Sequence, residues 1–81
     1  MNRSPLLERI TINPEVCHGK PTIRNKRYMV SSMLGYLAAG ETFESMLEEF
    51  EDLEQEDLLA CLAYAALTVD LKEIAVYPVA A

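Results

Sequence analysis

The segment EDLLACLAYAALTVDLK, residues 56–72, decides the fold, because it predicts a helix that is apolar on nearly every side. One face carries Leu58, Cys61, Leu62, Ala65 and Val69. Most of the remaining circumference is also apolar. Such a helix must be buried on more than one side, and two short helices from the same chain cover only part of it. We therefore expect a homodimer, with a candidate dimer interface made of Leu59, Ala63, Ala66 and Leu67.

Two shorter helices are predicted before this segment. In the first, apolar residues recur at helical spacing, with Ser31 or Ser32 as the cap and Gly40 as the stop: Val30, Met33, Leu34, Leu37, Ala38. The second, within ETFESMLEEF, has Thr42 as N-cap and Glu44 in its first turn. An acidic link, EDLEQED, joins it to the third helix. Three helices with a short turn between the last two are typical of a helix-turn-helix, or homeodomain-like, core.

Residues 9–30 predict a short β-hairpin or meander. RITINP alternates as a strand does and stops at Pro14, HGKP has turn chemistry, and TIRNKRYMV reads as two extended pieces around Asn25–Lys26. The expected apolar face consists of Ile10, Ile12, Ile23, Tyr28 and Val30. The fold class is therefore mainly α, with this β element in front of a trihelical core.

The chain of 81 residues predicts a single domain, 1–81. We expect a flexible lead-in over 1–8, the β region over 9–30, the three-helix core over 31–72 and a tail over 73–81, where EIAVYPV could add an edge strand. No apolar run reaches the roughly 18 residues of a membrane span. Two cysteines without a repeating spacing, and no secretory h-region, favour a reduced protein in the cytoplasm.

Charge divides the chain into a basic front and an acidic body. Residues 1–30 carry a net +4 and residues 31–81 a net −10, which together give the −6 of the whole chain. The acids of the second helix and the link predict either a solvated face or a docking face for a basic partner. The candidate partner-binding residues are Glu44, Glu48, Glu51 and Asp52.

The basic residues of the β region are the candidate DNA-binding group: Lys20, Arg24, Lys26 and Arg27. In a helix-turn-helix protein, the helix that contacts the bases in the major groove normally presents basic and amide side chains. The third helix here begins with Glu56 and Asp57, which would repel phosphates. A solvated hairpin is the equally weighted alternative.

Catalysis and metal binding find little support in the pattern. His18 is the only histidine and adjoins Cys17, but neighbouring side chains of an extended chain point apart and no cluster supplies about four metal ligands. We expect no catalytic residue, metal, cofactor or small-molecule substrate, and interpret Cys61 as a small core residue. The protein is thus predicted not to be an enzyme.

Between about Ile10 and Ala66 the chain resembles the small bacterial and archaeal family called domain of unknown function 433. The family pattern is an isoleucine strand, P-x-x-x-x-G-K-P-x-I-x-G-T-R, a helix ending in A-G, Y-P-x-L-T-x-E-D and an alanine-tyrosine-rich helix. Matching positions are Pro14, Gly19, Lys20, Pro21, Ile23, Arg27, Ala39, Gly40, Leu53, Glu56, Asp57, Ala63, Tyr64 and Ala65. The chain departs from it at Asn25, Lys26, Met29, Glu51 and Glu54, the last of which replaces a helix-capping threonine.

The resemblance implies a homeodomain-like trihelical fold with an N-terminal β element, usually dimeric. Genes of this family often neighbour one for a nuclease-like toxin of the PIN type. The implied function is that of a non-catalytic, antitoxin-like protein that binds and neutralises the toxin, with its own promoter DNA as a further partner. The alternatives are a DNA-binding regulator that uses the basic hairpin, and a dimeric scaffold protein.

Overall fold

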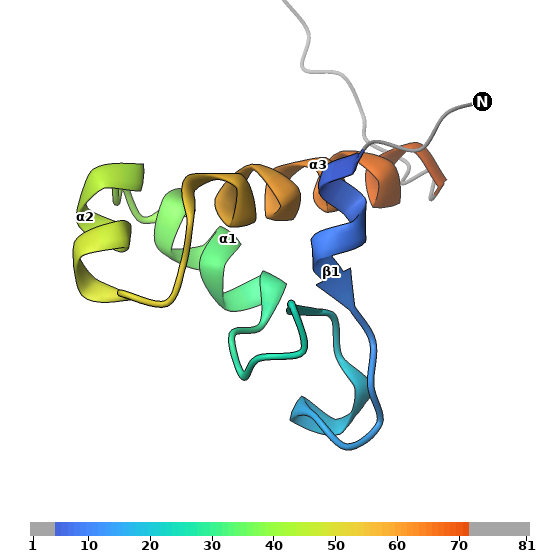
Figure 1. Ribbon diagram of the computed structural model, residues 1–81. Helices are drawn as coiled ribbons and strands as arrows, with labels where there is room; N and C mark the ends of the chain where they lie inside the picture. Colours follow the sequence, from blue (N-terminus) through green and yellow to red (C-terminus); the bar gives the residue numbers. More distant parts are fainter. Residues whose placement is uncertain (1–4, 72–81) are drawn as a thin grey trace, which may run out of the picture.

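The computed structural model of the protein describes residues 5–71, with side chains up to residue 69. Helix α3 spans the molecule, α1 crosses beneath it, α2 lies at one end, and the β region hangs below the other (Figure 1). The elements in chain order are the 3-10 helix η1 (Pro5–Arg9), β1 (Ile10–Thr11), the 3-10 helix η2 (Cys17–Gly19), β2 (Thr22–Ile23), α1 (Val30–Ala38), α2 (Phe43–Glu49) and α3 (Gln55–Leu71). The predicted class, mainly α with an N-terminal hairpin, is confirmed.

The end of α1 follows its predicted signal, but its beginning does not. Gly40 adopts a left-handed φ of +100°. Its N–H bonds the Leu37 carbonyl, and the next N–H along the chain bonds the Tyr36 carbonyl, each at 3.0 Å, which is a Schellman motif. The serine cap is wrong, because the helix already starts at Val30 and Met29 precedes it without a side-chain cap.

Helix α2 begins as predicted. Thr42 accepts a hydrogen bond from the Ser45 N–H at 3.1 Å, and the Ser45 hydroxyl accepts one from the Thr42 N–H at 3.2 Å. This reciprocal capping box satisfies two N–H groups that would otherwise lack partners at the helix start. The helix buries Met46 against the core and leaves its acidic side exposed.

Helix α3 supplies the centre of the core. Leu58, Ala60 and Cys61 are fully buried, and Leu58 and Cys61 pack with Ile23, Val30, Met33, Met46 and Leu53. Burial, with a smaller contribution from the nearby Asp57 charge, raises the pKa of the Cys61 thiol to about 11. Cys61 is therefore a protonated core residue, as its place on an apolar face predicted.

The β region consists of two short paired strands and a turn whose position differs from the prediction. Strands β1 and β2 pair antiparallel, with Ile10 opposite Ile23. The Lys26 N–H bonds the Ile23 carbonyl at 2.7 Å, and both residues between them, Arg24 (φ +46°) and Asn25 (φ +59°), are left-handed. These are the angles of a type I′ turn, centred one residue earlier than predicted.

Two further expectations for the N-terminal part need correction. Ile12 is exposed rather than part of the apolar face, because β1 ends at Thr11 and no ladder holds the next residue inward. Residues 5–8 belong to η1, which packs against α3 instead of trailing as a lead-in (Figure 1). Leu6 and Leu7 are half-buried there and replace part of the cover that we assigned to a second copy. The predicted edge strand of the tail lies outside the described residues.

None of the helices in the described part of the chain combines the length and the apolarity that a membrane crossing requires.

Candidate functional site

A buried carboxylate at the start of α3 joins the three parts of the fold. The Asp57 side chain is fully buried and accepts four hydrogen bonds. Arg24 donates from Nε to Oδ1 at 2.9 Å and from Nη2 to Oδ2 at 2.6 Å; Arg9 Nη1 donates to Oδ1 at 2.9 Å, and the Glu54 N–H to Oδ2 at 2.8 Å. We call Arg9, Arg24, Glu54 and Asp57 the Asp57 clamp.

Each member of the clamp is positioned by its own element. Arg9 ends η1, Arg24 lies in the left-handed turn after β2, and Asp57 is the third residue of α3. Glu54 directly precedes α3, so its bond to Asp57 is one half of a capping box. The other half, a bond from the Asp57 N–H to the side chain that replaces the family's threonine, is not made, because this N–H bonds the Glu54 carbonyl at 2.9 Å.

The clamp keeps all three central groups charged near neutral pH. Burial disfavours the Asp57 carboxylate, but hydrogen bonds from Arg24, the Glu54 N–H and Arg9 outweigh it and hold the pKa of Asp57 below its usual value. The hydrogen bonds with Glu54 and Asp57 raise the pKa of Arg9, and the bond with Asp57 raises that of Arg24. Asp57 is therefore suited to holding the fold together rather than to carrying protons at neutral pH.

The clamp also fixes the acidic link between α2 and α3. Arg24 Nη2 donates a second hydrogen bond to the Asp52 carbonyl oxygen at 2.9 Å. The Leu53 N–H bonds the Phe50 carbonyl at 3.0 Å, and Leu53 is buried. The link is consequently held at several points, while the carboxylates of Glu51 and Asp52 stay exposed.

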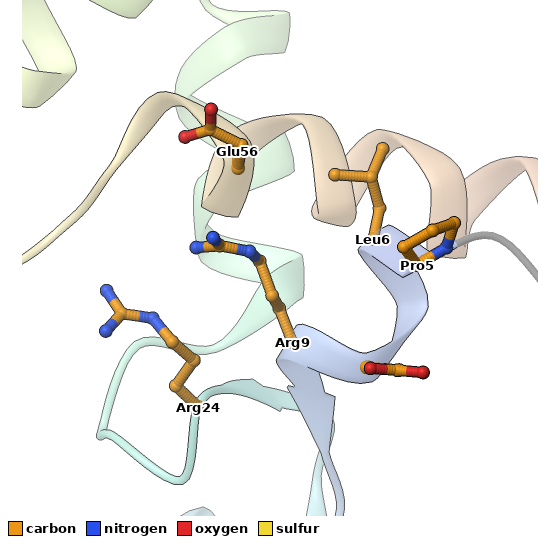
Figure 2. Close-up of a pocket in the computed structure, with 6 residues that line it drawn as sticks. Pro5, Leu6, Arg9, Arg24 and Glu56 are labelled. Carbon is orange, nitrogen blue, oxygen red and sulfur yellow. The ribbon is translucent and has the colours of Figure 1, made fainter.

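An open pocket of about 500 Å³ lies beside the clamp, between η1 and the first turn of α3. Figure 2 shows the Arg9 and Arg24 guanidiniums pointing in the same direction below Glu56, with Leu6 and Pro5 to the other side. The lining residues are Pro5, Leu6, Glu8, Arg9, Arg24 and Glu56. The pocket thus combines two cations, two anions and a short apolar wall.

The candidate DNA-binding residues differ in the contacts that they make. Arg24 is engaged in the clamp, while Lys20, Lys26 and Arg27 make no ion pair with the described residues. Lys20 lines a groove with Leu34 and Tyr64 between α1 and α3, and neither Lys26 nor Arg27 takes part in it. Arg24 is therefore bound within the fold, and the role of the four residues in DNA binding stays a prediction.

The candidate partner-binding acids are all exposed, which a solvated face and a docking face predict equally. Glu44 and Glu48 are exposed on α2, and Glu51 and Asp52 are exposed on the link. Their side chains make no ion pair with the described residues. We call these four exposed acids, which lie on α2 and on the link that follows it (Figure 1), the acidic surface at the α2 end of the molecule.

The candidate dimer residues are spread along α3, from its second turn onward. Leu59 and Ala63 are half-buried, and Ala66 and Leu67 are exposed. Leu62, at 43% exposure, and Val69, at 69%, also lie open, although the sequence assigned both to the covered face. We call Leu62, Ala66, Leu67 and Val69 the open face of α3.

The clamp is the feature that sequence reasoning missed. Asp57 looked like one more surface acid, and its arginine partners lie 33 and 48 residues away along the chain. The one local signal was its position three residues after Glu54, where a capping box places an acceptor. His18, exposed in η2 beside Cys17, joins no site of this kind, and the described residues hold no group of three or more potential metal ligands.

Comparison with known proteins identifies the family. Residues 10–65 match the family described as protein of unknown function, DUF433. The chain belongs to this family. A crystal structure of a DUF433 member from Anabaena variabilis ATCC 29413, at 2.00 Å resolution, is 32% identical with a TM-score of 0.71; the match covers 78% of this chain and 62% of that one. This DUF433 protein thus spans about three fifths of that relative's length. No curated protein matches it.

Proposed function

We propose that this DUF433 protein is a non-catalytic, antitoxin-like interaction protein that binds and neutralises a nuclease-like toxin of the PIN type. The toxin class comes from the family resemblance. The observation that carries the proposal is the acidic surface at the α2 end, with Glu44, Glu48, Glu51 and Asp52 all exposed. A nuclease must attract nucleic acid and so presents a basic face, to which an acidic surface is complementary.

The support for this docking surface is its rigidity. Because Arg24 holds the Asp52 carbonyl and Leu53 is buried, the backbone below Glu51 and Asp52 is ordered before any partner arrives. An ordered surface loses less conformational entropy on binding, so more of the interaction energy appears as affinity.

We also propose that the protein acts as a homodimer through the open face of α3. From Leu58 to Val69 the helix carries no charged residue, whereas residues 31–81 as a whole carry a net −10. Two copies with a net charge of −6 each repel one another least where neither presents a charge. Ala66 in this face, and the half-buried Ala63 one turn before it, are small enough to let two helices approach closely.

The second candidate function is binding to promoter DNA. It is favoured by the three cations of the β region that make no ion pair with the described residues, Lys20, Lys26 and Arg27. It is opposed by the acidic start of α3, where a helix-turn-helix protein would read bases. Both functions belong to the cytoplasm, which the free thiols of Cys17 and Cys61 favour.

The decisive experiment is co-expression with the product of the neighbouring gene, followed by co-purification and a ribonuclease assay. We expect a stable complex and loss of nuclease activity. Changing Glu48→Lys together with Glu51→Lys should weaken the complex at least tenfold, whereas Glu15→Lys, an exposed acid in the β region, should change affinity less than threefold. Absence of a complex, or an unchanged affinity in the double variant, would refute the acidic docking surface.

For DNA, the corresponding measurement is promoter binding over a series of salt concentrations. If Lys26 and Arg27 bind phosphates, changing both to Ala reduces the affinity for any sequence. The salt dependence then becomes shallower by about one unit of slope for each phosphate that the variant no longer binds. Identical curves for the variant and the original protein would exclude this second function.

A further inference from the structure

The pocket beside the Asp57 clamp contains arginine donors that the fold does not use. Arg9 makes its bonds to Glu54 and Asp57 from Nη1, so Nε and Nη2 have no acceptor among the described residues. Arg24 makes its bonds from Nε and Nη2, so Nη1 has none there either. Both side chains line the same pocket, and Figure 2 shows their guanidiniums turned to the same side. The two arginines therefore present several free N–H groups to one space.

These donors are held in place before a ligand arrives. The arginine side chains are 29% and 32% exposed, and both are bonded to a carboxylate that is fully buried. A long side chain normally loses rotamer freedom when it binds an anion, but here the folding of the protein has already ordered it. The planar fork of N–H groups on a guanidinium matches the two oxygens of a carboxylate.

The rim of the pocket restricts which anion fits. Glu8 and Glu56 are exposed, line the pocket and make no ion pair with the described residues. A polyanion such as a nucleic-acid backbone would bring further negative charge against them and against the net −6 of the chain. A segment with one carboxylate and one neighbouring cation satisfies the arginines and the glutamates together, and an adjacent apolar side chain can rest on Pro5 and Leu6.

We infer that this pocket binds an aspartate or glutamate side chain of a partner protein, in a segment where a lysine or arginine follows the acid. Arg9 and Arg24 take the carboxylate, and Glu8 and Glu56 take the cation. The inference rests on the proposed function in that the partner is a protein. It adds a second contact region, distinct from the acidic surface of α2, and gives the chemistry of the segment that it accepts.

The experiment uses the full chain and three probes. The Arg9 Nε–H resonance, assigned by comparison with Arg9→Lys, is followed by NMR during titration with acetyl-Leu-Asp-Lys-amide, acetyl-Leu-Asn-Lys-amide and inorganic phosphate at millimolar concentrations. We expect the aspartate peptide to shift the resonance along a saturating curve, with at least threefold tighter binding than either other probe. No saturable shift, or equal binding of the asparagine peptide, would overturn the inference.

Phosphate that binds as tightly as the aspartate peptide would also overturn it, since it would identify a phosphate site instead. A matched set of variants tests the rim without touching the clamp. Glu8→Gln with Glu56→Gln should reduce the preference for the lysine-containing peptide over acetyl-Leu-Asp-Gln-amide at least threefold and strengthen phosphate binding. Glu44→Gln on α2 is the control and should change neither; an unchanged preference in the double variant would refute the role of Glu8 and Glu56.

Failure of the peptide titration leaves the complex with the toxin untouched, because that complex is measured by co-purification and depends on Glu48 and Glu51. Conversely, peptide binding without a toxin complex would support the pocket as a binding site and refute the antitoxin-like role.

Discussion

The two halves of α3 contradict the usual division between polar outside and apolar inside. In the first half, the charged residue Asp57 is completely buried, and the hydrogen bonds that its carboxylate accepts all come from groups of the same chain. In the part of α3 that begins at Leu62, which we call its second half, Leu62 and Val69 lie open to solvent. In the first half, the buried carboxylate has all its hydrogen-bond partners within one chain. The second half carries apolar surface that a single chain leaves exposed.

The difference shows which part of the helix serves the fold and which part serves association. A buried carboxylate is tolerated only because two guanidiniums and a backbone N–H surround it, so its neighbours cannot vary independently. An exposed apolar residue imposes no such condition on the monomer. Substitutions in the first half should therefore change stability, and those in the second half should change assembly.

The largest expected effect comes from removing the buried charge. Asp57→Ala leaves two part-buried guanidiniums without their acceptor and should lower the free energy of unfolding by about 4 kcal/mol. Urea unfolding followed by circular dichroism measures this. The adjacent Glu56→Gln is the control and should stay within about 0.5 kcal/mol. Equal stability of the two variants would mean that the clamp does not hold the fold together.

A pair of leucines one turn apart gives the next effect. Leu58 is fully buried, so Leu58→Ala should cost about 3 kcal/mol of unfolding free energy. Leu62 is 43% exposed, and Leu62→Ala should cost less than about 1 kcal/mol in the monomer. The same urea titration, run at a dilution where the protein is monomeric, compares them. Similar costs would show that the two halves of α3 are equally buried.

The third effect concerns assembly alone. Ala66→Glu places a charge at the centre of the open face and should weaken dimerisation at least tenfold, or about 1.4 kcal/mol. Sedimentation equilibrium or light scattering over a range of concentrations measures it. Ala38→Glu, at an exposed position of α1, should leave the dimer unchanged. A dimer that survives Ala66→Glu must use another surface.

The smallest effect near neutral pH is the dependence of the unfolding free energy on pH. Because the pKa of Asp57 is lower in the folded than in the unfolded protein, the clamp contributes fully above the unfolded value of about 4. Its contribution is lost as the pH falls from there through the folded pKa. The free energy of unfolding should therefore differ little on this account between pH 7 and 5. The difference in unfolding free energy between the original protein and Asp57→Asn should disappear progressively below about pH 4. A difference in unfolding free energy between these two proteins that stays constant down to pH 2 would contradict the lowered pKa of Asp57.

Local signals in the sequence were sufficient for part of the fold. Thr42 and Gly40 act on the backbone within a few residues of themselves, so the start of α2 and the end of α1 could be predicted. The same holds for the length of α3, whose helical pattern is long and uninterrupted. The left-handed turn was placed one residue late, since both Asn25 and its neighbours are compatible with a tight turn and only strand pairing chooses the register.

The site depended on contacts that no local pattern reveals. Residues 5–8 have no helical periodicity and are ordered by packing on α3, so they were predicted as a lead-in, and Arg9 was predicted as the start of the β region rather than the end of η1. Arg24 read as a surface cation because its partner Asp57 is 33 residues away. The exposure of the acids on α2 and the link was predictable from composition, whereas the bond from Arg24 to the Asp52 carbonyl was not.

The span of the clamp also has a consequence for the order of folding. Its side-chain bonds connect residues 33 to 48 apart, whereas the turns of α1 and α2 close over a few residues. Loop closure over such distances is slow, so helical structure should form before the three segments meet at Asp57. In stopped-flow measurements, Asp57→Ala should then speed unfolding and leave the refolding rate nearly unchanged, which makes the clamp a determinant of how long the native state lasts once formed.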